Sequence, residues 1–475
     1  MCYSLKTLSN YAYLGFLSAK KVDKKPFLYA KIAIRGERFN LHGASNQKIG
    51  GMNMKQPNSN DRDYALQPVP QSARQGFWRM FAVMMGLTFF SASMWSGGSL
   101  GAGLTFTEFI LIVLAGNLIL GLYTGTLGYI AAKTGLSTHL LARYAFGEKG
   151  SYVASFLLGA TQVGWFGVGV AMFALPVQKV TGIDTYVLIA IAGVLMTATA
   201  YLGMKALTVL SIIAVPSIAV LGSLSTFEAA NTIGGMGGLF EYQPAESMAL
   251  AAALTICIGS FISAGTLTPD FARFAKTKKT GFVTTVIAFF IGNSLMFLFG
   301  AIGAIATGES DISEVMFLQG LIIPAIIILG LNIWTTNDNA LYASGLGFSH
   351  ITKISKNKVV IFNGIVGTVL AMWLYNNFVD WLTFLGSTLP PIGAIILADY
   401  FIVRRGQELK ESAIKVVNWL ALVAWGAGVL AASFVPGIAP LNALLGSAIT
   451  YIVLTFIKKR MTQQAEEVIE KKKVS

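Results

Sequence analysis

Five consecutive polar residues interrupt one of the apolar stretches of this sequence. They run from Thr335 to Asn339, within LNIWTTNDNALYASGLG (331–347). A helix facing lipid along its whole length would not carry so many polar groups, and contacts between helices need only one or two. Hydroxyl and amide groups can hold an ion or pair with a small molecule, so this segment is the first candidate site. Asp338 adds a carboxyl that could carry a proton or brace nearby backbone groups.

Three further stretches place glycine, hydroxyl and amide residues where lipid-facing helices carry leucine or isoleucine. TQVGWFGVGVAMF (161–173) sets Gln162 and Trp165 three residues apart, on one helix face. An interhelical hydrogen bond with ordinary packing is the alternative for this pair. GLTFFSAS (86–93) and GSFISAG (259–265) each predict a discontinuous helix whose free backbone groups face a cavity. Close packing through small residues is the alternative for both.

These groups together favour a flat, neutral ligand with hydrogen-bonding edges. Amides offer paired donors and acceptors, and aromatic rings stack on planar molecules. A nucleobase fits, whereas an amino acid or a sugar phosphate would require compensating charge. No paired carboxylates, metal ligands or nucleophile with its base can be assembled, so an enzyme is not expected. The histidines, which lie outside the apolar runs and are expected in solvated loops, are His42, His139 and His350.

The elements that must position these groups are membrane helices. Of the 475 residues 54% are hydrophobic and only 12% are charged, about half the share typical of soluble proteins. The sequence therefore predicts an all-α integral membrane protein. About twelve runs are long enough to span a bilayer, and they lie near 78–99, 109–132, 151–177, 185–203, 206–227, 247–268, 281–306, 319–346, 358–375, 380–402, 416–434 and 441–457.

Charged residues alternate between the connections of these runs. The formal net charge of +13 is concentrated before residue 81, so a nucleic-acid partner is not expected. Lys and Arg gather in every second connection, while the others hold mainly Asp and Glu, Lys179 excepted. This alternation predicts an even number of helices with both termini in the cytoplasm. The basic connections are 133–149, 273–279, 353–358, 404–415 and the tail 458–475.

An internal repeat relates the two halves of the chain. TFFSAS (88–93) resembles SFISAG (260–265) at an offset of 172 residues, and the same offset carries Gln162 to Trp334 and Trp165 to Asn337. The repeat holds five helices, an odd number, so its copies must be inserted in opposite orientations. The sequence predicts one copy at 78–240 and the other at 247–403, followed by two extra helices within 416–457.

The segment before the first run has no regular helix or strand pattern. Residues 1–65 are predicted to be a disordered cytoplasmic tail or an over-long N-terminal extension. The second interpretation places the true start of translation at Met54 or Met52. The two codons for Gly50 and Gly51 can spell the purine-rich ribosome-binding site of a bacterial gene, a few bases upstream of such a start.

The sequence resembles the nucleobase:cation symporter type 1 family. The resemblance is collinear over about residues 66–460 and includes the motifs above together with PVPQSAR (68–74), KTGLSTHLLAR (133–143) and LYNNFVDWLTFL (374–385). It implies a LeuT-like fold of twelve helices, in a five-plus-five inverted repeat with two extra C-terminal helices. It also implies a multi-pass protein of the bacterial inner membrane that takes up cytosine together with sodium. No cofactor beyond this coupling ion is expected, and a monomer is possible.

The resemblance assigns a role to individual residues. Cytosine would lie between the rings of Trp165 and Phe261, and its polar edge would contact Gln162, Ser263 and Asn337. Sodium would be held by the carbonyls of Gly86, Phe89 and Asn332 and the hydroxyls of Thr335 and Thr336. Uracil, a purine or hydantoin is the alternative substrate, and proton coupling through Asp338 is the alternative to sodium. Both hydroxyls could instead only bond back to carbonyls of the preceding turn.

Overall fold

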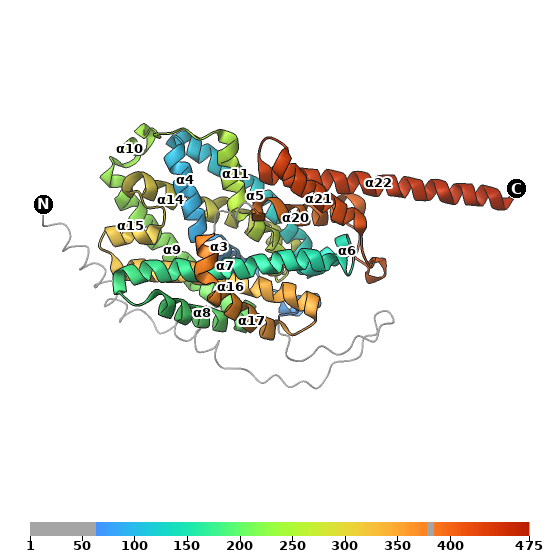
Figure 1. The fold of residues 1–475 in the computed structure, drawn as a ribbon, viewed down its shortest axis with the longest axis horizontal. Coiled ribbons are helices and arrows are strands. Elements are labelled where there is room, and N and C mark those ends of the chain that lie inside the picture. Colours follow the sequence, from blue (N-terminus) through green and yellow to red (C-terminus); the bar gives the residue numbers. More distant parts are fainter. Residues whose placement is uncertain (1–62, 378–383, 475) are drawn as a thin grey trace, which may run out of the picture. The chain divides into compact units, whose positions relative to one another are not determined.

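The structure, a computed structural model, describes residues 63–377 and 384–474, and its regular elements there are all helices (Figure 1). Of the predicted N-terminal extension, all but residues 63–65 lies outside the described residues. The first half of the fold comprises the short η2 (Gln71–Ala73), α3 (Phe77–Thr88), α4 (Ser91–Gly103), α5 (Phe106–Thr134), α6 (Thr138–Phe146), α7 (Gly150–Thr181), α8 (Thr185–Leu202), α9 (Met204–Thr232) and α10 (Gly235–Glu241).

The second half begins after the connection that follows α10. It comprises α11 (Leu250–Thr266), α12 (Thr268–Ala272), α13 (Lys278–Ile287), η3 (Ala288–Asn293), α14 (Ser294–Thr307), α15 (Ile312–Leu318), α16 (Ile322–Thr352), α17 (Lys356–Val369), α18 (Ala371–Asn376), α20 (Pro390–Leu397), η4 (Ala398–Val403), η5 (Glu411–Ala413), α21 (Trp419–Phe434) and α22 (Ala439–Val474).

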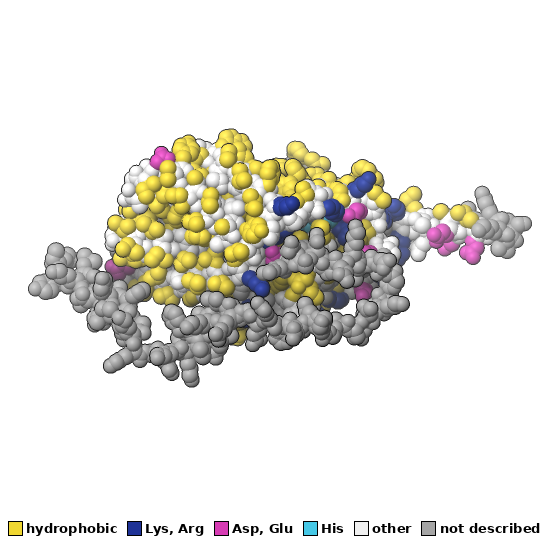
Figure 2. Space-filling view, turned by 90° about the horizontal axis from the view of Figure 1, so that it is seen from below, with side chains coloured by type: hydrophobic (Ala, Val, Ile, Leu, Met, Phe, Trp, Pro, Cys, Tyr) yellow, Lys and Arg dark blue, Asp and Glu magenta, His cyan; other side chains and the backbone are white. Residues whose placement is uncertain are grey.

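The described helices have the length and the surface of a membrane protein. Seven are long and apolar enough to cross a bilayer, or eight if the bent pair α3 and α4 forms one span, and α11 and α21 are shorter apolar helices. All twelve predicted runs overlap these elements, while the count of twelve spans stays a prediction. Large apolar side chains such as Val194, Leu224 and Phe362 are more than 60% exposed, and Figure 2 shows apolar side chains over much of the visible face. Lipid is the solvent that such a surface requires.

The predicted break in the first span is present. Helix α3 ends at Thr88 and α4 begins at Ser91, with a bend of 55° between them. A side chain from α16 caps the new helix start, because Asn332 Oδ1 accepts hydrogen bonds from Ser91 N at 2.8 Å and from Ser91 Oγ at 3.0 Å. The break therefore stays inside the protein without leaving these donors unsatisfied.

The predicted break within Gly259–Gly265 is wrong. Helix α11 is continuous through this stretch, and the interruption comes later, at Leu267, before the short α12. Gly265 serves packing instead, because a Cβ there would lie 2.7 Å from Thr124 Cγ2 on α5. Small residues here let two helices approach closely, as the alternative interpretation of the sequence holds.

Helices α7 and α16 pack along each other through the centre of the fold (Figure 1). They contain the two segments that the repeat offset relates, TQVGWFGV and NIWTTNDN. Close approach is built into the pair, because a side-chain carbon at Gly169 of α7 would collide with the amide of Asn337 on α16. The two most polar segments of the chain thus meet in the protein interior, away from lipid.

Candidate binding site

A small, partly enclosed cavity lies beside the break between α3 and α4. Four of the five residues predicted to contact cytosine line it, and they come from α7, α11 and α16: Gln162, Trp165, Phe261 and Asn337. Ser263 is buried on α11 but does not belong to the lining, where Ser260 appears instead. The sequence also missed Phe90, Phe271 and Asn339, although Asn339 ends the conspicuous polar run.

Each of the two predicted stacking rings is held by another aromatic side chain. Trp165 meets Phe90 edge-on, with ring centroids 5.4 Å apart and an interplanar angle of 76°. Phe261 meets Phe289 in the same way, at 5.2 Å and 85°. Such edge-to-face contacts fix the planes of both lining rings before any ligand binds.

The amide groups in the lining differ in the hydrogen bonds that they already make within the protein. Asn337 Nδ2 donates to the backbone carbonyl of Phe166 on α7 at 3.1 Å, which leaves its Oδ1 as an acceptor. Gln162 Nε2 is buried and has no hydrogen-bond partner among the described residues. The cavity therefore offers both an acceptor and a free donor between fixed aromatic rings. A planar, neutral molecule with a hydrogen-bonding edge matches this lining.

The oxygens predicted to hold sodium gather at the broken helix. Thr336 Oγ1 lies 3.3 Å from the carbonyl oxygen of Phe89 and 3.2 Å from that of Asn332. Thr335 Oγ1 lies 2.9 Å from the same Asn332 oxygen. Gly86 lies in the last turn of α3. Carbonyls in a last turn accept no hydrogen bond from an amide within their own helix, so the Gly86 carbonyl is a further candidate ligand.

Back-bonding by the two threonines does not remove these oxygens from use. The hydroxyls of Thr335 and Thr336 both reach carbonyls of the preceding turn, as the alternative interpretation predicted. A hydroxyl that donates its proton keeps its oxygen lone pairs. Thr336 in addition reaches across to the carbonyl of Phe89, in the break between α3 and α4. The neutral oxygen set thus fits a monovalent hard cation, which does not require a carboxylate.

Asp338 lies outside the cavity lining. It is fully buried, and its Oδ1 accepts a hydrogen bond from Thr199 Oγ1 of α8 at 2.7 Å. The same hydroxyl accepts from Trp334 Nε1 at 2.8 Å. Asp338 Oδ2 has no hydrogen-bond partner in the described part of the chain.

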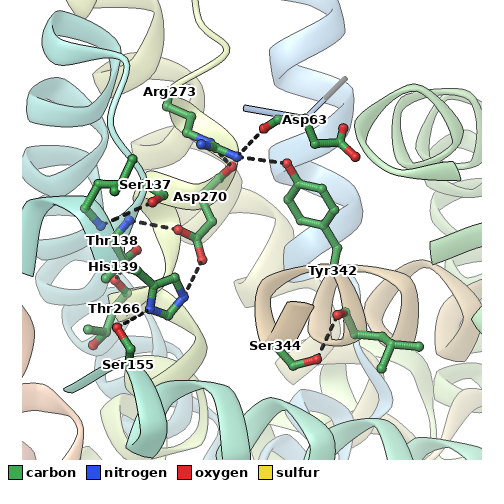
Figure 3. Close-up of polar contacts among 12 residues, drawn as sticks. Asp63, Ser137, Thr138, His139, Ser155, Thr266, Asp270, Arg273, Tyr342 and Ser344 are labelled. Atoms are coloured by element: carbon green, nitrogen blue, oxygen red, sulfur yellow. Dashed lines mark hydrogen bonds and ion pairs between the residues drawn. The ribbon is translucent and has the colours of Figure 1, made fainter. Parts of the chain in front are cut away.

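A second buried polar region is the charged cluster of Asp63, Arg273, Tyr342 and Lys356, and Figure 3 shows the first three of these residues. Arg273 is fully buried and donates to the carbonyl oxygens of Asp63 and Tyr64, both at 2.8 Å, and to the Tyr342 hydroxyl at 3.1 Å. The Asp63 carboxylate binds Lys356 Nζ at 2.5 Å and accepts from the backbone N of Met204 at 3.2 Å. Residues 63–65, predicted as part of a disordered or superfluous extension, are therefore ordered in this cluster.

Two of the three histidines are buried rather than solvated, which corrects the sequence-based expectation. His139 Nδ1 lies 3.1 Å from Ser155 Oγ, and its Nε2 lies 3.5 Å from Asp270 Oδ2 (Figure 3). His350 Nε2 lies 3.0 Å from Ser151 Oγ. The connections that carry them fold inward as helix ends, a tertiary effect that loop composition does not report. His42 lies outside the described residues.

A broken helix beside a partly enclosed, uncharged polar cavity, inside an apolar helical body, is the architecture of a secondary transporter. Solved structures share the fold. A nucleobase-cation-symport-1 family transporter, closed with bromovinylhydantoin bound, matches with a TM-score of 0.74 at 18% identity, over 83% of this chain and 95% of that one. A sodium-coupled sialic acid symporter matches with a TM-score of 0.57 at 14% identity, over 80% and 90%.

Sequence comparisons give the family. Residues 68–454 match the model of permeases for cytosine/purines, uracil, thiamine and allantoin. The cytosine permease of Escherichia coli (strain K12) is 56% identical over 413 residues, which are 87% of this chain and 99% of that protein. The hydantoin permease of Microbacterium maritypicum is 22% identical, over 83% and 88%. The chain belongs to this family of permeases and is a multi-pass membrane transporter, not an enzyme.

Proposed function

We propose that this transporter imports cytosine by sodium-coupled symport across a bacterial inner membrane. The observation that carries the proposal is the lining of the cavity, which combines fixed aromatic rings with amides and has no charged side chain among its lining residues. Cytosine is flat and neutral and carries donors and acceptors along its edges. The 56% identity to a cytosine permease supports this base over other family substrates.

In the proposed complex the base lies between Trp165 and Phe261. Stacking on an aromatic ring contributes about 1–3 kcal/mol per base and tolerates any base. Discrimination then falls to the amides, because a site built to bond a polar edge rejects a ligand that lacks it. Gln162 offers a donor and Asn337 an acceptor. Ser263 is proposed to contact the edge only if α11 rotates, since the serine is outside the present lining.

Sodium is proposed to bind at the carbonyls of Gly86, Phe89 and Asn332 with the hydroxyls of Thr335 and Thr336. The short distances from Thr336 to Phe89 and Asn332 support this site. The ion would join α3 to α16 at the break, next to the cavity. Closing that contact would shape the cavity lining, which includes Phe90 and Thr336. Sodium and cytosine would then strengthen each other's binding by the same factor.

Both termini are proposed to lie in the cytoplasm, with the basic connections on that side. Contacts between these connections support a common side: Lys133 Nζ donates to the carbonyl of Gly406, and Arg404 Nη2 donates to that of Tyr144. An ion pair joins Lys353 to Glu148. Basic connections on the cytoplasmic side are the general rule for membrane proteins.

Uptake of labelled cytosine into proteoliposomes tests the proposal. An inward sodium gradient should drive accumulation, and a potassium gradient of equal size should not. Unlabelled cytosine should compete more strongly than uracil, a purine or hydantoin. Uptake that ignores sodium, or that another of these compounds blocks better than cytosine, would overturn the corresponding part of the proposal.

Proton coupling through Asp338 is the second candidate, favoured by one observation. The Asp338 carboxyl is buried on α16 with a single hydroxyl donor and makes no ion pair among the described residues. A group in that setting could take up and release a proton during transport. Cytosine uptake driven by a proton gradient in sodium-free buffer, and abolished in Asp338→Asn, would favour this candidate.

A further inference from the structure

Asn339 is a buried amide with neither of its polar atoms in use. Its side chain is 2% exposed and lines the cavity, and neither Oδ1 nor Nδ2 has a hydrogen-bond partner among the described residues. Other buried asparagines of the same region are engaged. Asn332 Oδ1 caps Ser91, Asn337 Nδ2 donates to Phe166, and Asn363 Nδ2 donates to Ser344 Oγ at 3.0 Å.

An unpaired buried amide destabilises a fold, because water would have bonded both atoms in the unfolded chain. Such a group persists where something outside the chain completes it. Asn339 shares a helix face with two other lining residues, since Thr336 and Ala343 stand three and four residues from it. Asn337 is two residues away and turned by about 200° on the helix, toward α7. The side chains of Asn337 and Asn339 therefore leave the helix in different directions.

We propose that Asn339 is a recognition residue that pairs through both amide atoms with the ligand. This inference rests on the proposed function and deepens it. A carboxamide with both atoms free is complementary to an edge that carries a donor beside an acceptor, as in the bidentate pairing of asparagine with adenine. Cytosine has two such edges: the exocyclic amine beside ring N3, and the N1–H beside the carbonyl O2. The amide can turn to match either edge.

The cavity lining holds one more amide side chain, that of Asn339, than the resemblance assigns to substrate binding. Gln162 and Asn337 lie on or toward α7, at one side of the cavity. Asn339 lines the same cavity from α16 but stands about 200° around that helix from Asn337. With Asn339 included, a planar ligand between the rings would meet polar groups from two directions. A ligand with a single polar edge would leave Asn339 unpaired and would be rejected.

The experiment compares Asn339→Leu with Asn363→Leu, the same change at a buried asparagine that has an internal partner and lies outside the cavity. Purified full-length protein in detergent is melted with and without cytosine, and cytosine binding is titrated. For Asn339→Leu we expect a melting temperature without ligand at or above that of wild type, and a cytosine Kd raised about tenfold. For Asn363→Leu we expect a lower melting temperature and a Kd within twofold of wild type.

A structural role for Asn339 would give the opposite pattern. A fall in the ligand-free melting temperature of Asn339→Leu with an unchanged cytosine Kd would overturn the inference. Wild-type protein that does not bind cytosine would overturn the proposed function and this inference with it. Wild-type protein that binds cytosine while Asn339→Leu binds it equally well would overturn the inference alone.

A second variant, Asn339→Ala, tests the inference without placing a bulky side chain in the cavity. Asn339→Ala is titrated with cytosine, with 2-pyrimidinone, which lacks the exocyclic amine, and with 4-aminopyrimidine, which lacks the carbonyl. Wild type should prefer cytosine over both analogues. In Asn339→Ala at least one of these preferences should shrink severalfold, and that one identifies the edge. If both preferences stay as in wild type, Asn339 does not read the base.

Discussion

The cavity around Trp165 and the charged cluster around Arg273 both lie in the protein interior, but their polar groups are satisfied differently. In the charged cluster, Arg273 donates to three carbonyls and a hydroxyl, and Asp63 binds Lys356. In the cavity, amide atoms of Gln162 and Asn339 have no partner in the described part of the chain. Removing a donor from the cluster would leave buried acceptors unsatisfied and should destabilise the fold, whereas the unpaired amides that line the cavity are groups that a bound ligand can complete.

Removing Arg273 should give the largest effect, and it should fall on stability. Arg273→Ala would leave the carbonyls of Asp63 and Tyr64 and the Tyr342 hydroxyl without their donor. Leaving a buried acceptor without its donor costs about 1–3 kcal/mol for each group. We expect a strongly lowered melting temperature in detergent and little folded protein at growth temperature.

Arg273→Lys is the matched control for this prediction. It keeps the charge but cannot reproduce the guanidinium fork that reaches four acceptors, so its melting temperature should fall between those of wild type and Arg273→Ala. If Arg273→Ala instead melts as wild type does and loses only cytosine uptake, the cluster belongs to the transport mechanism and the comparison fails.

Trp165→Ala should weaken cytosine binding and leave the melting temperature nearly unchanged, the reverse of the effect expected for Arg273→Ala. The ring forms one wall of the cavity and is 5% exposed. Losing a stacking face should weaken cytosine binding by about 1–3 kcal/mol, or roughly five- to 150-fold in Kd. Titration of purified protein checks this. Trp165→Phe, which keeps a ring, should recover most of the affinity, and wild-type affinity in Trp165→Ala would exclude this cavity as the cytosine site.

Gly169→Ala should give a smaller effect that is transmitted through Asn337. The new methyl group would collide with the Asn337 amide and push it away from the Phe166 carbonyl. Overpacking of this kind costs about 1–3 kcal/mol. We expect a several-fold rise in the cytosine Kd, measured by titration. Gly330→Ala is the control, because a Cβ there would meet only Phe173, at 3.7 Å; an equal loss in both variants would mean that helix rigidity, not Asn337, is affected.

The sequence predicted those parts of this structure that depend on local composition. Spans follow from hydropathy along about twenty residues, and the break near Phe89 follows from small and hydroxyl residues within one run. The same reasoning failed at Gly259–Gly265, where small residues pack against α5. Composition alone does not distinguish a broken helix from a closely packed one, because both require residues without bulky side chains.

Contacts between distant segments were out of reach of the sequence. Asp63 and Arg273 are 210 residues apart, and the residues around each of them do not indicate that the two will be in contact. His139 and His350 were expected in solvent because their connections are polar, yet each finds a serine hydroxyl in the interior. In the cavity the residue types were predictable, since polar groups are conspicuous in an apolar run. Which of them remain unpaired, as Asn339 does, depends on the packing of all surrounding helices.

The smallest expected effect is on sodium binding, and it tests whether the neutral oxygens beside the cavity bind the coupling ion. Thr336 contributes one oxygen to the proposed sodium site, so Thr336→Ala should raise the sodium concentration for half-maximal cytosine binding by roughly fivefold, about 1 kcal/mol. Thr336→Ser keeps the hydroxyl and should stay near wild type. Thr161→Ala removes a hydroxyl on α7 whose one contact among the described residues is back to its own helix, and it should leave sodium dependence unchanged. Because linkage is reciprocal, the weaker sodium binding of Thr336→Ala should appear as a loss of cytosine affinity only at low sodium, and saturating sodium should restore it. A loss that persists at saturating sodium would instead place Thr336 in the base site, whose lining it shares.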